Sequence, residues 1–304
     1  LKRCGYLGID EPFAGLQTQG MICHATYRDE GGDWLLPDEV ESDGVGGFRR
    51  RATGRAVTVG RTEKMSKSKK NVVEPEEIIE SYGADTARLF MLSDSPPDRD
   101  LDWTEAGIEG AWRYLNRLWR MVNEPIVELC EIGARKPDTL SEELVAVERA
   151  IHKTIAAVSD DLDRFHFNKA IARIRELTNE LEEIEGDSCG AGWVLREGLE
   201  TVVRLIGPMM PHLGEELWQK LGHSQMLTVT GWPEAEASLL VDENVTIAVQ
   251  VNGKLRGTLD LPKDCEPKIA EAAALDLENV LAFMKGKPAK KIIVVPNRII
   301  NVVI

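Results

Sequence analysis

The chain has 304 residues, 43% of them hydrophobic, and a formal net charge of -14. This length predicts about two or three domains, and the lack of any uncharged apolar run of about eighteen residues argues against a membrane partner. Five scattered cysteines without a C-x-x-C pair argue against a structural zinc site and favour a reducing, cytoplasmic location. The first residue is Leu1 rather than methionine, and we expect the chain to be a fragment.

Residues 1–60 mix glycines with short apolar runs, a pattern that predicts strands and turns. Within this region, residues 29–47 are typical of a small inserted loop or mini-domain. His24 has no partner at ligand spacing, so a structural role is favoured over metal binding.

Positive charge is concentrated between residues 49 and 70, although the chain as a whole is acidic. The distribution argues against indiscriminate nucleic-acid binding and is compatible with a polyanion held at chosen points. The segment holds one acid, Glu63, and nine basic residues: Arg49, Arg50, Arg51, Arg55, Arg61, Lys64, Lys67, Lys69 and Lys70.

The same segment contains the pattern Lys64-Met65-Ser66-Lys67-Ser68, after a predicted strand and before a predicted helix. Lysine is a flexible point charge and serine a short hydrogen-bond donor, so the pattern suits a mobile loop that grips a phosphate chain. A solvated basic loop explains most charge runs and stays open as the alternative. No P-loop pattern occurs.

Helices are predicted next. Pro75 in a first turn, acids after it and Gly83 at the end predict a helix over residues 75–82. A second helix is predicted to begin near Asp85, for which we favour a cap over a buried structural acid.

Four amphipathic stretches follow with short connections, and together they predict a helical bundle. Thr139 with Glu142 predicts a capping box before one of them, and we expect Trp112, Trp119, Trp218 and Trp232 in the core or between helices. The stretches cover residues 107–130, 142–165, 167–184 and 198–222, the last broken at Pro208 and Pro211.

The pattern changes again after Trp232 and Pro233. Two alternating runs around Asn252 and Gly253 predict a β-hairpin. An alanine-rich helix and a strand-like end follow, so we expect a separate small α+β domain.

The ordered set of motifs resembles the bacterial leucyl family of class I aminoacyl-tRNA synthetases over residues 11–304. The pattern KMSKS is the second signature of that class. Isoleucyl and methionyl enzymes usually carry cysteine-rich zinc motifs, and valyl enzymes typically end in a coiled coil; neither occurs here. The stretches that resemble the leucyl family are GLQTQGMI, KMSKSKKNVVEPEEIIESYGADTARLF, PMMPHLGEELWQKLG with GWPEA, VQVNGKLRGTL and KKIIVVPNRIINVV.

The resemblance implies a multidomain fold, mainly α with α+β parts. The first class signature, His-Ile-Gly-His, and the large editing insert are missing, so only a piece of the class I nucleotide-binding catalytic domain is expected. The implied order is the tail end of that domain (1–26), a leucine-specific insertion (27–60), the KMSKS loop with a connecting helical region (61–104), a helical bundle of anticodon-binding type (105–235) and a C-terminal α+β tRNA-binding domain (242–304).

The resemblance also implies an activity in translation. Leucine–tRNA ligases activate leucine with ATP to leucyl-adenylate and transfer it to the leucine tRNA. The chain is expected to be inactive without a missing N-terminal catalytic and editing portion, and the full enzyme is expected to be monomeric. Mg2+ would arrive with ATP, and no protein-bound zinc or other metal is expected. The alternative is a stand-alone RNA-binding or regulatory module, which the intact KMSKS pattern disfavours.

Residue roles are carried over by motif position. Lys67 is expected to contact the pyrophosphate with help from Lys64, whereas Met65, Ser66 and Ser68 complete the ATP-binding loop. Lys69 and Lys70 lie outside the motif and are expected on a solvated or tRNA-facing surface. Contacts to tRNA, with ordinary charged surfaces as the alternative, are expected from Arg113, Arg117, Arg120, Lys254, Arg256, Lys290, Lys291 and Arg298.

Overall fold

The computed structural model describes residues 1–11, 13–186, 189–241, 244–284 and 288–304. The chain divides into two units, Leu1–Ala235 and Glu236–Ile304, and each has a hydrophobic core of its own. No helix in these described ranges is long and apolar enough to cross a membrane.

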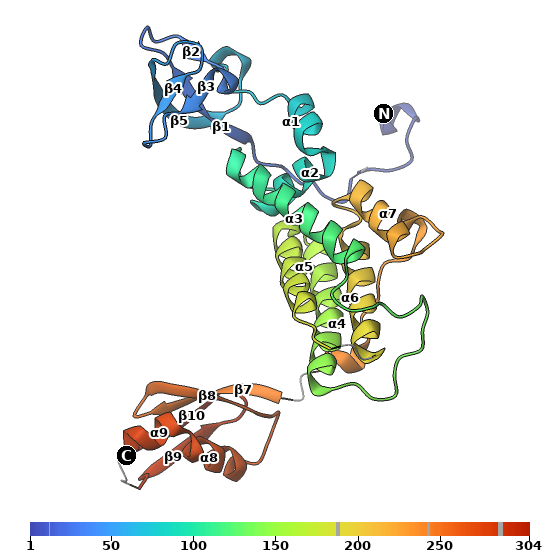
Figure 1. Ribbon diagram of the computed structural model, residues 1–304, viewed down its shortest axis with the longest axis vertical. Coiled ribbons are helices and arrows are strands. Elements are labelled where there is room, and N and C mark those ends of the chain that lie inside the picture. Colours follow the sequence, from blue (N-terminus) through green and yellow to red (C-terminus); the bar gives the residue numbers. More distant parts are fainter. Residues whose placement is uncertain (12, 187–188, 242–243, 285–287) are drawn as a thin grey trace. The chain divides into compact units, whose positions relative to one another are not determined.

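Residues 22–64 of the first unit contain most of the strands of a small sheet (Figure 1). Its central strands, β1 and β5, pair antiparallel and run across the predicted boundaries at residues 26 and 60. The predicted mini-domain contributes strands to this sheet around a core of Tyr27, Leu35, Val40 and Val57. The strands are β1 (Ile22–Arg28), β2 (Trp34–Leu35), β3 (Val40–Ser42), β4 (Phe48–Arg50) and β5 (Ala56–Lys64) in the order β2-β1-β5-β4-β3, with β6 (Leu101–Asp102) parallel to β1; short 3-10 helices are η1 (Lys2–Cys4) and η2 (Pro37–Glu39).

Helices make up the rest of the first unit. Pro75 opens α1 and Gly83 ends it, as predicted. The predicted capping box is wrong, because α4 begins at Glu142 and Ser141, not Thr139, accepts the Leu144 N–H. The helices are α1 (Pro75–Tyr82), α2 (Ala84–Ser93), α3 (Glu105–Asn123), α4 (Glu142–Asp163), α5 (Phe167–Glu182), α6 (Cys189–Ile206) and α7 (Pro211–Lys220), with the 3-10 turns η3 (Lys67–Lys69) and η4 (Leu227–Val229).

The apolar stripes of the helices meet in one core. Leu144, Ile151, Ile155 and Val158 of α4 are buried, as are their counterparts along α5, because residues three and four apart share one helix face. The predicted stripe ends early, since Phe165 takes a left-handed backbone after α4 and is 49% exposed. The helical bundle that the periodicity predicts is therefore present.

Helix α2 holds the corner between α6 and α7. Buried Asp85 accepts the Leu213 N–H on Oδ2 (2.7 Å) and lies 2.9 Å from His212 Nδ1 through Oδ1. One turn later, Arg88 donates to the carbonyls of Pro208 and Met209, both at 2.9 Å. The favoured role of Asp85 as a cap of its own helix is wrong: it is the buried structural acid, and it caps α7 instead.

The second unit is a four-stranded sheet with two helices on one face (Figure 1). Asn252 and Gly253 both have positive φ and form the predicted hairpin turn. The single predicted alanine-rich helix is two helices, because Leu277 between them is extended. The elements are η5 (Ala237–Leu239), β7 (Asn244–Val251), β8 (Lys254–Pro262), α8 (Pro267–Asp276), α9 (Glu278–Met284), β9 (Lys291–Val295) and β10 (Ile299–Val303), with the sheet order β8-β7-β10-β9 and β10 parallel to β7.

The Asp85→Ala change tests the α2 contact. It leaves the Leu213 N–H without its acceptor, and we expect the free energy of unfolding of the first unit to fall by about 2–3 kcal/mol. Urea unfolding followed by circular dichroism measures the loss. The matched control is Asp94→Ala at the exposed end of the same helix, expected within about 0.5 kcal/mol of wild type. Equal losses in the two variants would contradict this role of Asp85.

Candidate functional site

The KMSKS segment forms one ordered turn between β5 and α1. β5 ends at Lys64, and the Met65 N–H donates to the Ile22 carbonyl of β1 (3.1 Å). Ser66 caps η3: its Oγ accepts the Lys69 N–H (3.3 Å) and contacts Ser68 Oγ (2.9 Å). The backbone of the turn is thereby fixed by its own serines and by the neighbouring strand.

Asn71 fastens this turn to the sheet. Its side chain is fully buried; Oδ1 accepts the Ser66 N–H (2.9 Å), and Nδ2 donates to the carbonyls of His24 (3.1 Å), Glu63 (3.1 Å) and Lys64 (3.4 Å). These four backbone groups come from both strands and from the turn itself. Asn71 was not predicted from the sequence, in which it is only a polar residue directly after the lysine cluster.

The lysines of the turn fall into two groups. Lys69 pairs with Glu63, the single acid of the segment. Lys64 and Lys67 are exposed, and within the described ranges neither ammonium has an ion-pair or hydrogen-bond partner. The structure thus brings the five expected ATP-contacting residues together on one turn and leaves its two expected catalytic cations unpaired.

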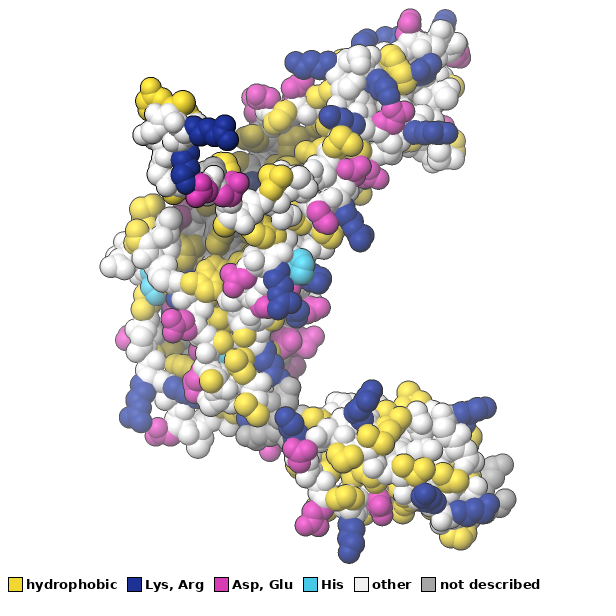
Figure 2. All heavy atoms as spheres, turned by 180° about the vertical axis from the view of Figure 1, so that it is seen from behind, with side chains coloured by type: hydrophobic (Ala, Val, Ile, Leu, Met, Phe, Trp, Pro, Cys, Tyr) yellow, Lys and Arg dark blue, Asp and Glu magenta, His cyan; other side chains and the backbone are white. Residues whose placement is uncertain are grey.

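The arginines of the basic segment are largely neutralised in space. The pairing of β3 with β4 sets Glu41 opposite Arg49 (2.8 Å between Oε1 and Nε), and Glu39 contacts Arg50 at 2.9 Å. The Leu36 N–H and the Arg50 guanidinium hold the pKa of the Glu39 carboxyl below its ordinary value. Figure 2 shows dark-blue cations interspersed with magenta acids over strands β1–β5. The positive charge counted in this sequence segment is therefore not one cationic patch.

The three arginines of α3 differ in their partners. Arg117 makes a bidentate contact with Glu182 of α5 (2.9 and 2.7 Å), a bond that raises the pKa of its guanidinium. Arg113 is exposed and lies 3.7 Å from Glu109. Arg120 is exposed, has no side-chain partner among the described residues, and lines a cavity of about 390 Å³ with Arg117. Arg113 and Arg120 thus keep exposed charge, while Arg117 ties α3 to α5.

Tryptophans are exposed on the same helix. Of the four tryptophans expected in the core or between helices, Trp218 is buried (5% exposed), whereas Trp112 (45%), Trp119 (37%) and Trp232 (38%) are not core residues. Trp119 nevertheless lies beside Lys220 of α7, and Trp232 donates to Ser159 of α4, so these two do lie against neighbouring helices. Trp112 and Trp119 are seven residues apart, so they lie on one side of α3, away from the buried Tyr114. This side of α3 carries aromatic rings beside the exposed arginines.

The five cations of the second unit that are expected to contact tRNA do not all lie together. Lys254 begins β8, directly after the β7–β8 turn. The end of β10 lies beside this turn, and its residue Val303 pairs with Lys291 of β9, so Lys291 is at the same end of the sheet. Lys290 joins them through its N–H bond to Val303 (2.8 Å). Arg298 precedes β10 at the opposite end, and the Arg256 guanidinium lies 3.3 Å from the Phe283 ring centre. Lys254, Lys290 and Lys291 thus form a group at one end of the sheet, with Lys254 on edge strand β8 and Lys291 on edge strand β9.

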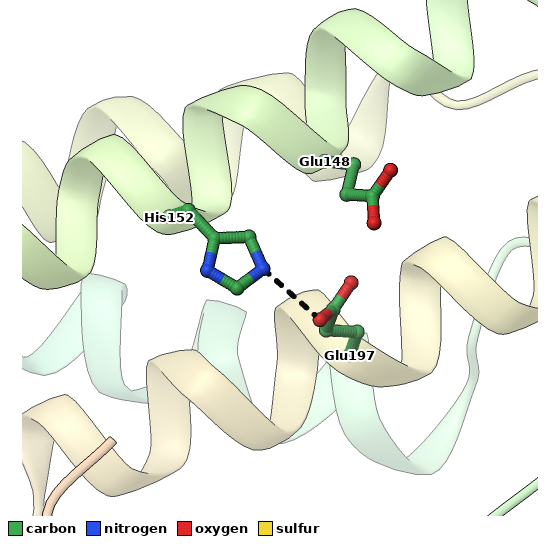
Figure 3. A group of neighbouring side chains, drawn as sticks. All are labelled: Glu148, His152 and Glu197. Carbon is green, nitrogen blue, oxygen red and sulfur yellow. Dashed lines mark ion pairs between the residues drawn. The ribbon is translucent and has the colours of Figure 1, made fainter. Parts of the chain in front are cut away.

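Sequence analysis also missed a cluster that could hold a metal ion: Glu148 and His152 of α4 with Glu197 of α6 (Figure 3). Their ligand atoms all lie within 4.8 Å of one another. Lys136 donates to Glu148 Oε1, and His152 Nε2 lies 3.3 Å from Glu197 Oε1. Since each carboxylate already has a partner, we interpret the cluster as a polar contact between the two helices. The i, i+4 spacing on α4 was its only sequence signal.

Comparison with known proteins shows which proteins the chain resembles. Residues 146–271 match the anticodon-binding domain of tRNA ligase, and residues 48–104 match the class I tRNA synthetases (I, L, M and V). Over its whole length the chain is 62% identical to the leucine–tRNA ligase of Paramagnetospirillum magneticum and 57% identical to that of Rhodospirillum rubrum. The whole chain is therefore similar to part of a leucine–tRNA ligase. It spans about a third of these relatives, 35% of the length of each.

A solved structure shows the same similarity. The ternary complex of an Agrobacterium radiobacter LeuRS with tRNA and LeuAMS matches 99% of this chain and 35% of that chain, at 30% identity and a TM-score of 0.69. The resemblance to the C-terminal part of a bacterial leucyl enzyme is confirmed. The domain boundaries and the residue roles stay predictions.

Asn71→Asp tests the fastening of the turn. The change keeps one acceptor for the Ser66 N–H but sets a carboxylate oxygen against the three carbonyls that Nδ2 now serves. We expect loss of hydrogen-exchange protection at the Ser66 amide and a fall of about 2–4 kcal/mol in the free energy of unfolding, with Asn71→Ala no worse.

The control for Asn71 is Asn116→Ala on the exposed surface of α3, expected to change the free energy of unfolding by less than about 0.5 kcal/mol. Unchanged protection of Ser66 in Asn71→Asp would show that the side-chain amide does not hold the turn.

Because Tyr114 is buried, we expect the folded protein to lose stability at high pH. Burial raises its pKa to about 12, against the opposing charges of Arg175 and Arg117. Its neutral form is therefore favoured in the folded state, so stability is full below pH 10, the ordinary tyrosine value, and falls as the pH rises through about 12. Absorbance at 295 nm should show a late ionisation that Tyr114→Phe removes. A late ionisation that persists in the variant would assign it to another tyrosine.

Proposed function

We propose that the chain is the C-terminal part of a leucine–tRNA ligase and supplies it with the ATP-contacting KMSKS turn and with tRNA-binding surfaces. Lys64 and Lys67 support this most directly: they are exposed and unpaired on a turn that Asn71 fastens, whereas Lys69 is paired with Glu63. Similarity to leucine–tRNA ligases over the whole chain favours the enzyme over a stand-alone RNA-binding module.

The reaction would proceed in two steps. The carboxylate of leucine attacks the α-phosphorus of ATP and pyrophosphate leaves; the leucyl group of the adenylate then passes to the 3′-terminal adenosine of the leucine tRNA. Negative charge on the phosphates increases in the first step, and the ammonium groups of Lys67 and Lys64 would stabilise it there.

The other residues of the turn would position the nucleotide. Ser66 and Ser68 share one contact between their hydroxyls, which leaves donor capacity for phosphate oxygens, and half-buried Met65 would pack near the adenine. Mg2+ would accompany ATP and neutralise part of its charge, and we propose no zinc site.

The proposed layout keeps residues 1–26 as the end of the catalytic domain, 27–60 as the leucine-specific insertion, 61–104 as the KMSKS region, 105–235 as the bundle and 242–304 as the C-terminal tRNA-binding domain. The division of the chain at Ala235 supports the last boundary. An N-terminal catalytic and editing portion would complete a monomeric, cytoplasmic enzyme of translation, without which this chain would be inactive.

Leucine tRNA is the proposed macromolecular partner. The Agrobacterium radiobacter relative was solved with tRNA, which supports this choice. Exposed Arg113, Arg120 and the group of Lys254, Lys290 and Lys291 would contact the phosphate backbone first. Arg117, Arg256 and Arg298 complete the proposed tRNA-binding set.

Lys67→Ala tests the catalytic part. We expect this chain, combined with the N-terminal portion, to support leucine-dependent exchange of labelled pyrophosphate into ATP, and the variant to slow it at least about 100-fold, since such a charge contributes about 3 kcal/mol or more to the barrier. Lys70→Asn is the matched control: it removes a charge from the same turn, tolerates the left-handed backbone there, and should change the rate less than about threefold. Exchange that is indifferent to Lys67 would overturn the proposal.

A further inference from the structure

Two cysteines that are far apart in the sequence lie side by side in the first unit. Cys130, in the connection between α3 and α4, has its Sγ 3.7 Å from the Sγ of Cys189, the first residue of α6. The Cys130 thiol also donates to the Cys189 carbonyl (3.3 Å). Cys4, Cys23 and Cys265 have no second sulfur in contact within the described ranges.

Hydrogen bonds from the backbone and from two side chains hold the connection that carries Cys130 against α6. The Cys130 N–H donates to the Gly192 carbonyl (3.4 Å), Arg196 donates to the Cys130 carbonyl, and Trp193 Nε1 donates to the Ala134 carbonyl (3.0 Å). A Cβ at Gly192 would lie 2.3 Å from the Glu128 carbonyl oxygen, so only glycine permits this close approach. The connection between α3 and α4 therefore packs on the first turns of α6. The two thiols are in contact without any change in the backbone.

We propose that Cys130 and Cys189 are an oxidation-sensitive pair that hydroperoxides convert to an intramolecular disulfide. Exposed Cys189 attacks the O–O bond as thiolate; its sulfur becomes a sulfenic acid, and water or an alcohol leaves. The Cys130 sulfur then attacks the sulfenic sulfur, the S–S bond forms and water leaves. Two thiols are oxidised by two electrons, and one peroxide is reduced.

The order of the two cysteines follows from their surroundings. Burial raises the pKa of the Cys130 thiol, and the Cys189 sulfur raises it further, against the charge of Arg196. Cys130 therefore suits the resolving step, in which a neighbouring thiol attacks an already oxidised sulfur, and exposed Cys189 meets the peroxide first.

The disulfide would brace the bundle. It joins two residues that are 59 positions apart in the sequence, closes a loop that contains all of α4 and α5, and restricts the unfolded chain. It would also fix the connection that carries Lys136, the partner of Glu148 in the cluster of Figure 3. We expect the melting temperature of the oxidised chain to exceed that of the reduced chain by about 5 °C or more.

The test treats the full chain, in a Cys4→Ser background that blocks cross-linking through that exposed thiol, with hydrogen peroxide. We expect the intact mass to fall by about 2 Da, one cross-linked tryptic peptide pair to join Cys130 to Cys189, and dithiothreitol to reverse both. Cys23 and Cys265 stay available to alkylation after unfolding. Melting curves of the two forms measure the bracing.

Cys130→Ser and Cys189→Ser are the matched controls, and neither should show the 2 Da loss. Separate alkylation of both residues after oxidation would overturn the proposal, as would sulfinic acid at Cys189 without a cross-link or a bond only between two chains. A disulfide that forms without raising the melting temperature would show that it does not brace the bundle.

Discussion

The first unit depends on hydrogen bonds to backbone groups at the corner between α6 and α7, which have no partners within either helix. A connection between two helices has carbonyls that no helical turn satisfies, and a helix that begins leaves amides without partners. Arg88 serves the carbonyls of Pro208 and Met209, and Asp85, one turn earlier on α2, serves the Leu213 amide. Because α2 follows the KMSKS turn and α1 directly, this contact also joins the candidate site to the bundle.

Local sequence patterns predicted the helices and turns, whereas the roles of individual side chains depend on contacts between residues far apart in the sequence. Pro75, Gly83 and the Asn252-Gly253 turn act through their own backbone angles, so their positions followed from the sequence alone. Asp85 could not be assigned in this way, because its partner lies 128 residues away. The arginines of the basic segment do not form a cationic patch for the same reason. The register between strands sets acids opposite them, and a count of charges along the sequence does not include that register.

The candidate site shows a similar division. The motif identified Lys64 and Lys67 but not what holds them, since Asn71 acts by bonding to four backbone groups and has no marked sequence pattern. Fixing the backbone while leaving the ammonium groups free is physically consistent, because a lysine paired within the turn, such as Lys69, would have to break that pair before it bound a phosphate. The single acid of the segment thereby separates the lysine that is held from those that are available.

The connection between α3 and α4 contains neither helix nor strand, yet it completes the bundle. Glu148 is 2% exposed, and a carboxylate so deeply buried is tolerated only when it is paired. Lys136 comes from this connection, as does Cys130, and both reach side chains of the helices that follow. The connection must therefore keep its close fit against Gly192 for the buried charge to stay paired. That same fit holds the two sulfurs 3.7 Å apart. The two thiols are therefore close because the connection packs on α6 in the position from which Lys136 pairs with Glu148.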